Sequence, residues 1–228
     1  MSDTPSHDHD HDHDHDHVDN IEGSSNYNQH GPHPYQPDSE DTPYEHHQVM
    51  AEAVGELLIE KGVITADEMR AMIELIDSKS PAEGARIIAR AWTDPNFKMR
   101  VLENVNDAAA ELDIDSGTIP IRAVENTDDV HNVIVCTLCS CYPRQMIGLP
   151  PDWYKSRSYR SRVVYEPRAV LKEFGTNISE KTEVRVHDST ADLRYLVIPK
   201  RPNNSENMSE DELATLVTRD SMIGVTSI

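Results

Sequence analysis

The sequence predicts a mixed α/β (α+β) fold, in which an N-terminal helical arm precedes a layered domain of strands and helices. Three observations support this prediction: a polar beginning, apolar residues at helical spacing from Tyr44 to about Leu112, and strand-like apolar runs after Gly117. We therefore divide the 228 residues into a disordered tail (1–43), a helical arm (44–116) and an α/β domain (117–228).

The first 43 residues are rich in His, Asp, Asn and Pro and contain few aliphatic side chains. Such a segment cannot bury enough apolar area to offset the entropy of ordering, so we expect it to be disordered. Six histidines alternate with five aspartates between His7 and His17. This tract can hold divalent cobalt, nickel or zinc loosely, although a solvated low-complexity tail or a purification tag are alternatives.

The arm shows apolar residues spaced three or four apart, which is typical of helices with one apolar face. The signals that delimit four helices are the stop at Gly62, the capping box Thr65–Glu68, the similar start Ser80–Glu83 and the start Asp94–Pro95. With few large side chains, the arm is expected to pack on another body, and we interpret its Met and Ile stripes as core or subunit contacts.

The domain after Gly117 alternates strands with short helices. Strands are expected near 119–123, 133–135, 184–186 and 194–198, and short basic helices between 149 and Phe174. A second capping box, Ser209–Glu212, predicts a last helix that ends near Asp220.

The formal charge of −20 argues against a nucleic-acid partner, because phosphate binding requires an excess of clustered Lys and Arg. No apolar run is long enough for a membrane helix, and the N-terminus lacks the basic and apolar regions of a signal peptide. We therefore expect no membrane contact and a cytoplasmic location.

All three cysteines, Cys136, Cys139 and Cys141, lie within six residues directly after a buried strand. An odd, clustered count indicates metal ligands or redox chemistry rather than a disulfide framework. A structural zinc site would need a fourth ligand, for which His131 and His187 are the candidates, and a thioredoxin-type motif fits poorly with a third cysteine.

Several collinear segments resemble the α subunits of nitrile hydratases, and the resemblance extends over residues 47 to 228. The segments are Glu125–Thr127, Val130–Asn132, the string from Cys136 to Cys141, Leu149–Ser156, Tyr159–Arg162, Glu166–Arg168, Arg194–Tyr195 and Val217–Gly224. The resemblance implies a nitrile-hydratase-like fold and a hydro-lyase that converts small nitriles to amides.

In this family the metal is non-corrin cobalt(III) or non-haem iron(III), held by three sulfurs and two deprotonated backbone amides. The resemblance implies that Cys136 is a thiolate, Cys139 a sulfinate and Cys141 a sulfenate, with the amides of Ser140 and Cys141 completing the metal ligands. Thr137 is similar to cobalt members, so cobalt(III) is favoured over iron(III). Thiolates suit such late transition metals, and oxygens on Cys139 and Cys141 can position or activate a water.

The resemblance also implies partners that this chain does not contain. Activity would require a β subunit, in an αβ assembly or an α2β2 heterotetramer, and a metallochaperone or activator during maturation. The β subunit would supply arginines to the cysteine oxygens, and Arg194 of this chain matches an arginine with a supporting role. An ordinary ion pair is the alternative for Arg194.

Two positions depart from the nitrile hydratase pattern. Arg144 stands where that family usually has Trp, and Gly117 where it often has Gln. Arg144 resembles the related thiocyanate hydrolase γ subunits, and a cation beside the metal would suit an anionic substrate. We therefore count Arg144 with Cys139, Ser140 and Cys141 as candidate catalytic residues, and we keep a thiocyanate-hydrolase-like subunit and a noncatalytic metal-binding or storage protein as alternatives.

Overall fold

The computed structural model describes residues 46–228, so the predicted disordered tail and its His/Asp tract lie outside the described residues. The mixed α/β fold is confirmed for the described part of the chain. Its helices are α1 (His46–Glu60), α2 (Ala66–Ser78), α3 (Ala82–Thr93), α4 (Pro95–Glu103), α5 (Val105–Ala110), α6 (Arg144–Ile147), α7 (Asp152–Lys155), α8 (Arg157–Tyr165), α9 (Pro167–Glu173), α10 (Glu210–Leu216) and α11 (Arg219–Ile223). Its strands are β1 (Ile121–Glu125), β2 (Val130–Val135), β3 (Glu183–Asp188) and β4 (Arg194–Ile198).

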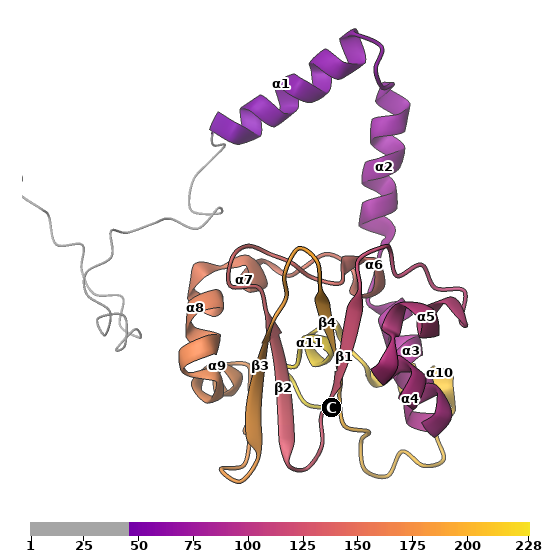
Figure 1. Cartoon of the computed structure of the whole chain (residues 1–228), viewed down its shortest axis with the longest axis vertical. Helices are drawn as coiled ribbons and strands as arrows, with labels where there is room; N and C mark the ends of the chain where they lie inside the picture. Colours follow the sequence, from indigo (N-terminus) through magenta and orange to yellow (C-terminus); the bar gives the residue numbers. More distant parts are fainter. Residues whose placement is uncertain (1–45) are drawn as a thin grey trace, which may run out of the picture. The chain divides into compact units, whose positions relative to one another are not determined.

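The strands form two parallel pairs in the centre of the domain (Figure 1). β1 pairs with β4, so that Ile121 lies opposite Arg194, and β2 pairs with β3, so that Val135 lies opposite Asp188. The second half of β2 consists of the buried β-branched residues Val133, Ile134 and Val135, as expected for a strand covered on both faces. The last residue of β3 therefore lies beside the point where β2 ends and Cys136 follows.

Helices flank the strands on both sides, with α3, α4, α5 and α10 beside β1 and α8 and α9 beside β3 (Figure 1). Gly84 of α3 permits a close approach to α6, because a Cβ at this position would lie 2.6 Å from a methyl carbon of Ile147. Ile87 and Ile88 of α3 are fully buried in the same core as the strands. The proposed division of the chain at residues 116 and 117 stays a prediction.

Capping chemistry explains where several helices begin. The predicted capping boxes Thr65–Glu68 and Ser209–Glu212 are both confirmed, each with reciprocal hydrogen bonds. The start at Ser80 differs from the prediction, because the Ser80 hydroxyl accepts a hydrogen bond from the Ala82 amide and no side chain caps α3.

The predicted last helix is two helices. α10 ends at Leu216, and α11 begins after Thr218, whose hydroxyl accepts a hydrogen bond from the Ser221 amide. This second cap takes the chain out of the helical conformation at Val217 and Thr218, so the helix predicted to reach Asp220 is interrupted.

The first two helices, α1 and α2, leave large apolar side chains exposed, including Val49, Val54, Leu57, Met72 and Leu75. α2 contains no buried residue. Apolar faces of this kind mark surfaces that contact another body. Within residues 46–228, no helix combines the length and apolar character that crossing a membrane would require.

Candidate metal centre

The three cysteine sulfurs converge at the carboxyl end of β2. The Sγ atom of Cys139 lies 3.5 Å from that of Cys136 and 3.3 Å from that of Cys141, and all three lie within 4.8 Å of one another. Cys136 is buried, Cys141 is partly buried and Cys139 is exposed. The sequence thus places three soft ligands around one point, open to solvent on one side.

Backbone amides also turn inward at this loop, which we call the cysteine loop (residues 136–141). The amide of Cys139 donates a hydrogen bond of 3.3 Å to the sulfur of Cys136. Burial raises the pKa of Cys139, but hydrogen bonds from Cys141, Cys136 and the amides of Ser140 and Cys141 outweigh it and lower this pKa. The amides of Ser140 and Cys141 therefore face the same sulfur cluster.

The electrostatics of the cluster match a cation. Burial, together with the neighbouring sulfurs of Cys139 and Cys136, raises the pKa of Cys141 to about 12. Several thiolates this close repel one another, and a metal ion would supply the positive charge that lets them ionise together. Three sulfurs and inward amides fit a thiolate-preferring transition metal.

Contacts from distant parts of the chain hold the cysteine loop. The carboxylate of Asp188, at the end of β3, accepts hydrogen bonds from the amide of Thr137 at 2.9 Å and from its hydroxyl at 2.6 Å. Arg160 of α8 donates a bond of 3.4 Å to the carbonyl of Thr137. These contacts fix the first turn of the loop immediately after Cys136.

An aromatic cluster supports the other end of the loop. The buried hydroxyl of Tyr154 donates to the carbonyl of Cys141 at 3.0 Å, and its ring packs edge to face on Tyr142. Tyr159 donates to the carbonyl of Ile134 in β2 at 2.7 Å. Burial raises the pKa of both Tyr154 and Tyr159 far above the ordinary value, so both phenols stay protonated donors.

Arg194, the first residue of β4, has a buried Nη1 atom without a hydrogen-bond partner in the described part of the chain. Its charge acts on Cys141, whose pKa it lowers against the larger effect of burial. A buried, unpaired N–H donor is costly, so this group is suited to an acceptor that residues 46–228 do not provide.

Arg144 lies in a different setting. It is exposed on α6 and lines a cavity of about 140 Å³ together with Gln145, Lys79 and residues of α2 such as Leu75. The Gln145 side chain packs where Gly117 lacks a Cβ, because a Cβ there would lie 3.1 Å from Gln145 Cγ. The structure thus brings the three cysteines together but assigns Arg144 no contact with their sulfurs.

The two histidines considered as zinc ligands have other partners. His131 Nε2 is 2.7 Å from the carbonyl oxygen of Gly224, and His187 Nε2 is 2.8 Å from the side-chain oxygen of Asn132. Among the described residues, the group of His, Cys, Asp and Glu that converges as a metal site consists of cysteines alone.

Sequence reasoning missed Asp188, Arg160 and Tyr154 as supports of the cysteine loop. Asp188 closes a strand parallel to β2, so a correct strand pairing would have placed its carboxylate near Thr137. Nothing in the local sequence around Tyr154 indicates that its hydroxyl reaches the carbonyl of Cys141.

These features define an α/β chain with a cluster of three cysteines that could hold a metal ion. The family model described as nitrile hydratase, alpha chain, matches residues 45–226, and the chain belongs to this family.

The chain is 49% identical over 177 residues to a nitrile hydratase subunit alpha from Rhodococcus sp, covering 76% of this chain and 88% of the relative. It is 48% identical to the cobalt-containing nitrile hydratase subunit alpha of Pseudonocardia thermophila, covering 76% and 86%. It is also 38% identical to the thiocyanate hydrolase subunit gamma of Thiobacillus thioparus, covering 78% of each chain.

Solved structures of a thiocyanate hydrolase and of a nitrile hydratase are also similar to this chain. A recombinant thiocyanate hydrolase with partially modified cobalt centers matches with a TM-score of 0.74 at 36% identity, covering 81% of this chain and 90% of that one. A double mutant of the Fe-type nitrile hydratase from Comamonas testosteroni Ni1 matches with a TM-score of 0.74 at 39% identity, covering 82% and 92%.

Proposed function

We propose that this chain is the metal-holding catalytic subunit of a nitrile hydratase, which adds water to a small nitrile and releases the corresponding amide. The observation that carries the proposal is the convergence of three cysteine sulfurs within 4.8 Å at the end of β2. Membership of the nitrile hydratase α-chain family supports the reaction class.

Cys136, Cys139 and Cys141 would hold the metal through sulfur, and the amides of Ser140 and Cys141 through nitrogen. A bound trivalent metal would supply Lewis-acid polarisation of the nitrile and would lower the pKa of water. In the balanced reaction one water adds across the carbon–nitrogen triple bond, its oxygen bonding to carbon and both hydrogens ending on nitrogen.

We infer that, during maturation, an external oxidant such as molecular oxygen converts Cys139 to a sulfinate and Cys141 to a sulfenate. Their oxygens would accept hydrogen bonds from the attacking water and orient it toward the nitrile carbon. The unpaired Nη1 of Arg194 supports this inference, because an oxygen added near Cys141 would provide the acceptor that this buried donor lacks. Arg194 is then a positioning residue.

Cobalt(III) is the proposed metal. Two relatives at 47–48% identity are named as cobalt-containing subunits, and Thr137 resembles the residue implied for cobalt members. Iron(III) is the less favoured alternative, although an Fe-type nitrile hydratase shares the fold.

We further propose that a β-type subunit completes the site, in an αβ or α2β2 assembly, after a metallochaperone or activator has delivered the metal. The side chain of Leu138 at the tip of the cysteine loop is 85% exposed, and α1 and α2 carry further exposed apolar residues. These surfaces suit a permanent partner, whose apolar core would bury them.

Arg144 supports a second candidate, a thiocyanate-hydrolase-like subunit. This exposed cation follows the cysteine loop, and a thiocyanate hydrolase subunit gamma is 38% identical to the chain. Thiocyanate is an anion, so a cation that reached the site would favour it over a neutral nitrile. That reaction would combine thiocyanate with two waters to release carbonyl sulfide, ammonia and hydroxide.

The experiment is co-expression with a β-type subunit in cobalt-supplemented medium, followed by two parallel assays. We expect acrylamide to form from acrylonitrile and no carbonyl sulfide to form from thiocyanate. The reverse result would support the second candidate, and cobalt binding without either product would indicate a noncatalytic metal-binding protein.

Mass spectrometry of the peptide that contains Cys136 to Cys141 tests the chemistry of the centre. Three added oxygen atoms are expected, two on Cys139 and one on Cys141. Three unmodified thiols with bound zinc in active protein would contradict the proposal.

A further inference from the structure

A second cavity lies at the opposite end of β2 from the cysteine loop. Its lining includes His131 at the beginning of β2, whereas Cys136 follows the end of the strand at Val135. At about 3.3 Å per residue, the strand separates the two sites by roughly 15 to 20 Å. A ligand in this cavity of about 270 Å³ therefore cannot touch the cysteine sulfurs.

One wall of the cavity is held in place by Arg168. This guanidinium donates to the carbonyls of Ile178 at 3.2 Å and Ser179 at 3.0 Å, and also to that of Thr182. The hydroxyl of Thr182 in turn donates to the carbonyl of Asp128 at 2.9 Å. The loop that carries Ser179 is thus joined to the turn between β1 and β2, and the cavity is formed before a ligand arrives.

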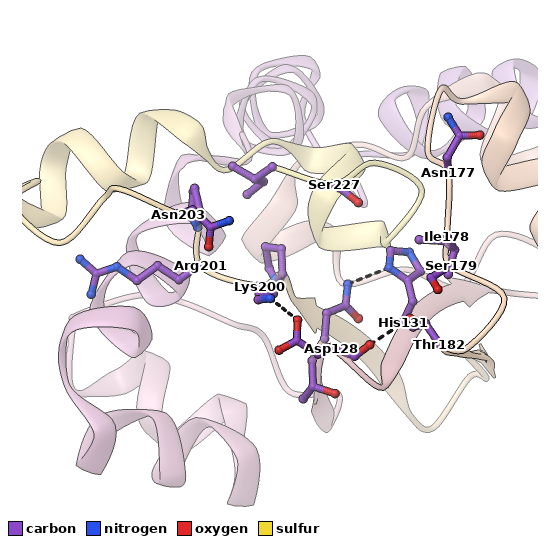
Figure 2. A pocket seen from close by; sticks show the side chains of 15 residues that line it. Asp128, His131, Asn177, Ile178, Ser179, Thr182, Lys200, Arg201, Asn203 and Ser227 are labelled. Atoms are coloured by element: carbon purple, nitrogen blue, oxygen red, sulfur yellow. Dashed lines mark hydrogen bonds and ion pairs between the residues drawn. The ribbon is translucent and has the colours of Figure 1, made fainter.

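The opposite wall is held by Arg201. Its guanidinium donates to the carbonyl of Trp92 at 3.0 Å, and to the hydroxyl at 3.0 Å and the carbonyl at 2.7 Å of Ser205. Figure 2 shows this guanidinium pointing away from the other lining side chains. Its hydrogen bonds therefore stabilise its own loop rather than a ligand.

The side-chain charges that face the cavity balance. The ammonium of Lys200 forms an ion pair with the carboxylate of Asp128 (Figure 2). Burial lowers the pKa of His131, so this imidazole is neutral at pH 7, with Nε2 donating to the Gly224 carbonyl. Asp128 and His131 also belong to no convergent metal-ligand group among the described residues. These side chains therefore leave no unpaired charge for an ion and form no ligand set for a metal ion.

Most of the remaining lining consists of amide and hydroxyl side chains, which both donate and accept hydrogen bonds. Four of them also take part in hydrogen bonds within the chain, namely Asn126, Thr127, Ser179 and Thr182. The side chains of Asn177, Asn203 and Ser227 are exposed at the cavity and are the main groups that face a ligand. We propose that this cavity binds a small neutral molecule with a primary carboxamide group. The choice of an amide rather than another neutral compound rests on the proposed function, whose product is an amide.

The test is a titration of the full chain, produced without added cobalt, with three molecules of similar size. These are neutral propanamide, anionic propanoate and cationic propylammonium, followed by calorimetry or protein NMR. We expect one saturable site for propanamide and at least about tenfold weaker binding of both ions, since each would leave a charge unpaired. Propanoate or glycerol binding as tightly as propanamide would overturn the assignment.

Two exposed asparagines allow the site to be located without disturbing the core. The Asn177→Ala and Asn203→Ala double variant should weaken propanamide binding about 5- to 100-fold, the expectation for two lost hydrogen bonds. The matched control is Asn96→Ala, an exposed asparagine of α4 outside the lining, which should leave binding unchanged. Unchanged affinity in the double variant would overturn the proposal.

The titration measures binding to a chain that turns over no nitrile. A negative acrylonitrile assay therefore refutes the proposed function without affecting this titration. Conversely, an active enzyme whose metal-free chain does not bind propanamide refutes the amide cavity alone.

Discussion

Replacing Asp188 with Asn should loosen the cysteine loop without unfolding the domain. The carboxylate accepts two hydrogen bonds from Thr137, at 2.9 and 2.6 Å, and an amide side chain offers one accepting oxygen. Hydrogen bonds to charged groups contribute about 1.5–3 kcal/mol when shielded, and less at an exposed site such as this one. A loss of about 1–2 kcal/mol corresponds to roughly 5- to 30-fold weaker metal binding, within the range of outer-sphere substitutions.

The assay combines cobalt content per chain, the mass of the cysteine-loop peptide and unfolding in urea. Asp188→Asn should lower cobalt content and cysteine oxidation while the free energy of unfolding of the metal-free chain falls by less than about 2 kcal/mol. The control is Asp192→Asn, an exposed carboxylate in the turn between β3 and β4, which should behave like the unchanged chain. Full cobalt content and normal oxidation in Asp188→Asn would refute the reasoning.

A double-mutant cycle isolates the contact itself. Thr137→Val removes the hydroxyl donor but keeps the amide, so its effect and that of Asp188→Asn should be coupled by about 0.5–1.5 kcal/mol. Strict additivity of the two effects on cobalt affinity would show that Asp188 acts through another group.

Three further predictions concern the support of the cysteine loop by Tyr154, the substrate preference and the pH dependence of stability. Tyr154→Phe should lower the free energy of unfolding by about 1 kcal/mol, because the carbonyl of Cys141 loses its donor; no change in the urea midpoint would contradict this role. Arg144→Trp should raise kcat/KM for neutral nitriles, whereas an unchanged kcat/KM would place Arg144 outside the substrate path. Because burial lowers the pKa of His131, the unfolded chain binds a proton that the folded chain does not. The neutral His131 therefore stabilises the folded chain fully above the ordinary pKa of about 6.5, and this stabilisation is lost as the pH falls below that value. The free energy of unfolding should differ less between pH 7.5 and pH 5.5 in His131→Asn than in the unchanged chain.

Local chemistry made part of the fold predictable. The capping boxes at Thr65 and Ser209 depend on residues three positions apart, and the structure forms both. The change from helical to alternating spacing after Gly117 likewise depends on neighbours in sequence, so β1 and β2 were anticipated within a few residues.

The remaining features depend on contacts that the local sequence does not contain. Asp188 reaches Thr137 across 51 residues only because β3 pairs in parallel with β2. The interruption before α11 arises because α10 ends with its C-cap at Val217 and Thr218 caps the start of a new helix. Apolar periodicity alone would have continued the helix to Asp220. The cavity that Arg144 lines depends on how α6 is placed beside α2, and no sequence motif indicates this placement.

The separation between the cysteine loop and Asp188 also has a consequence for biosynthesis. The cysteines leave the ribosome 47 or more residues before the carboxylate that holds Thr137, which at 5–20 residues per second amounts to about 2–10 s. During this interval Cys136 and Cys139 are close in sequence but unrestrained, and their sulfurs, 3.5 Å apart in the folded chain, are free to be oxidised to a disulfide. Early delivery of the metal, or a reducing environment during synthesis, would therefore protect the ligands until β3 has paired with β2.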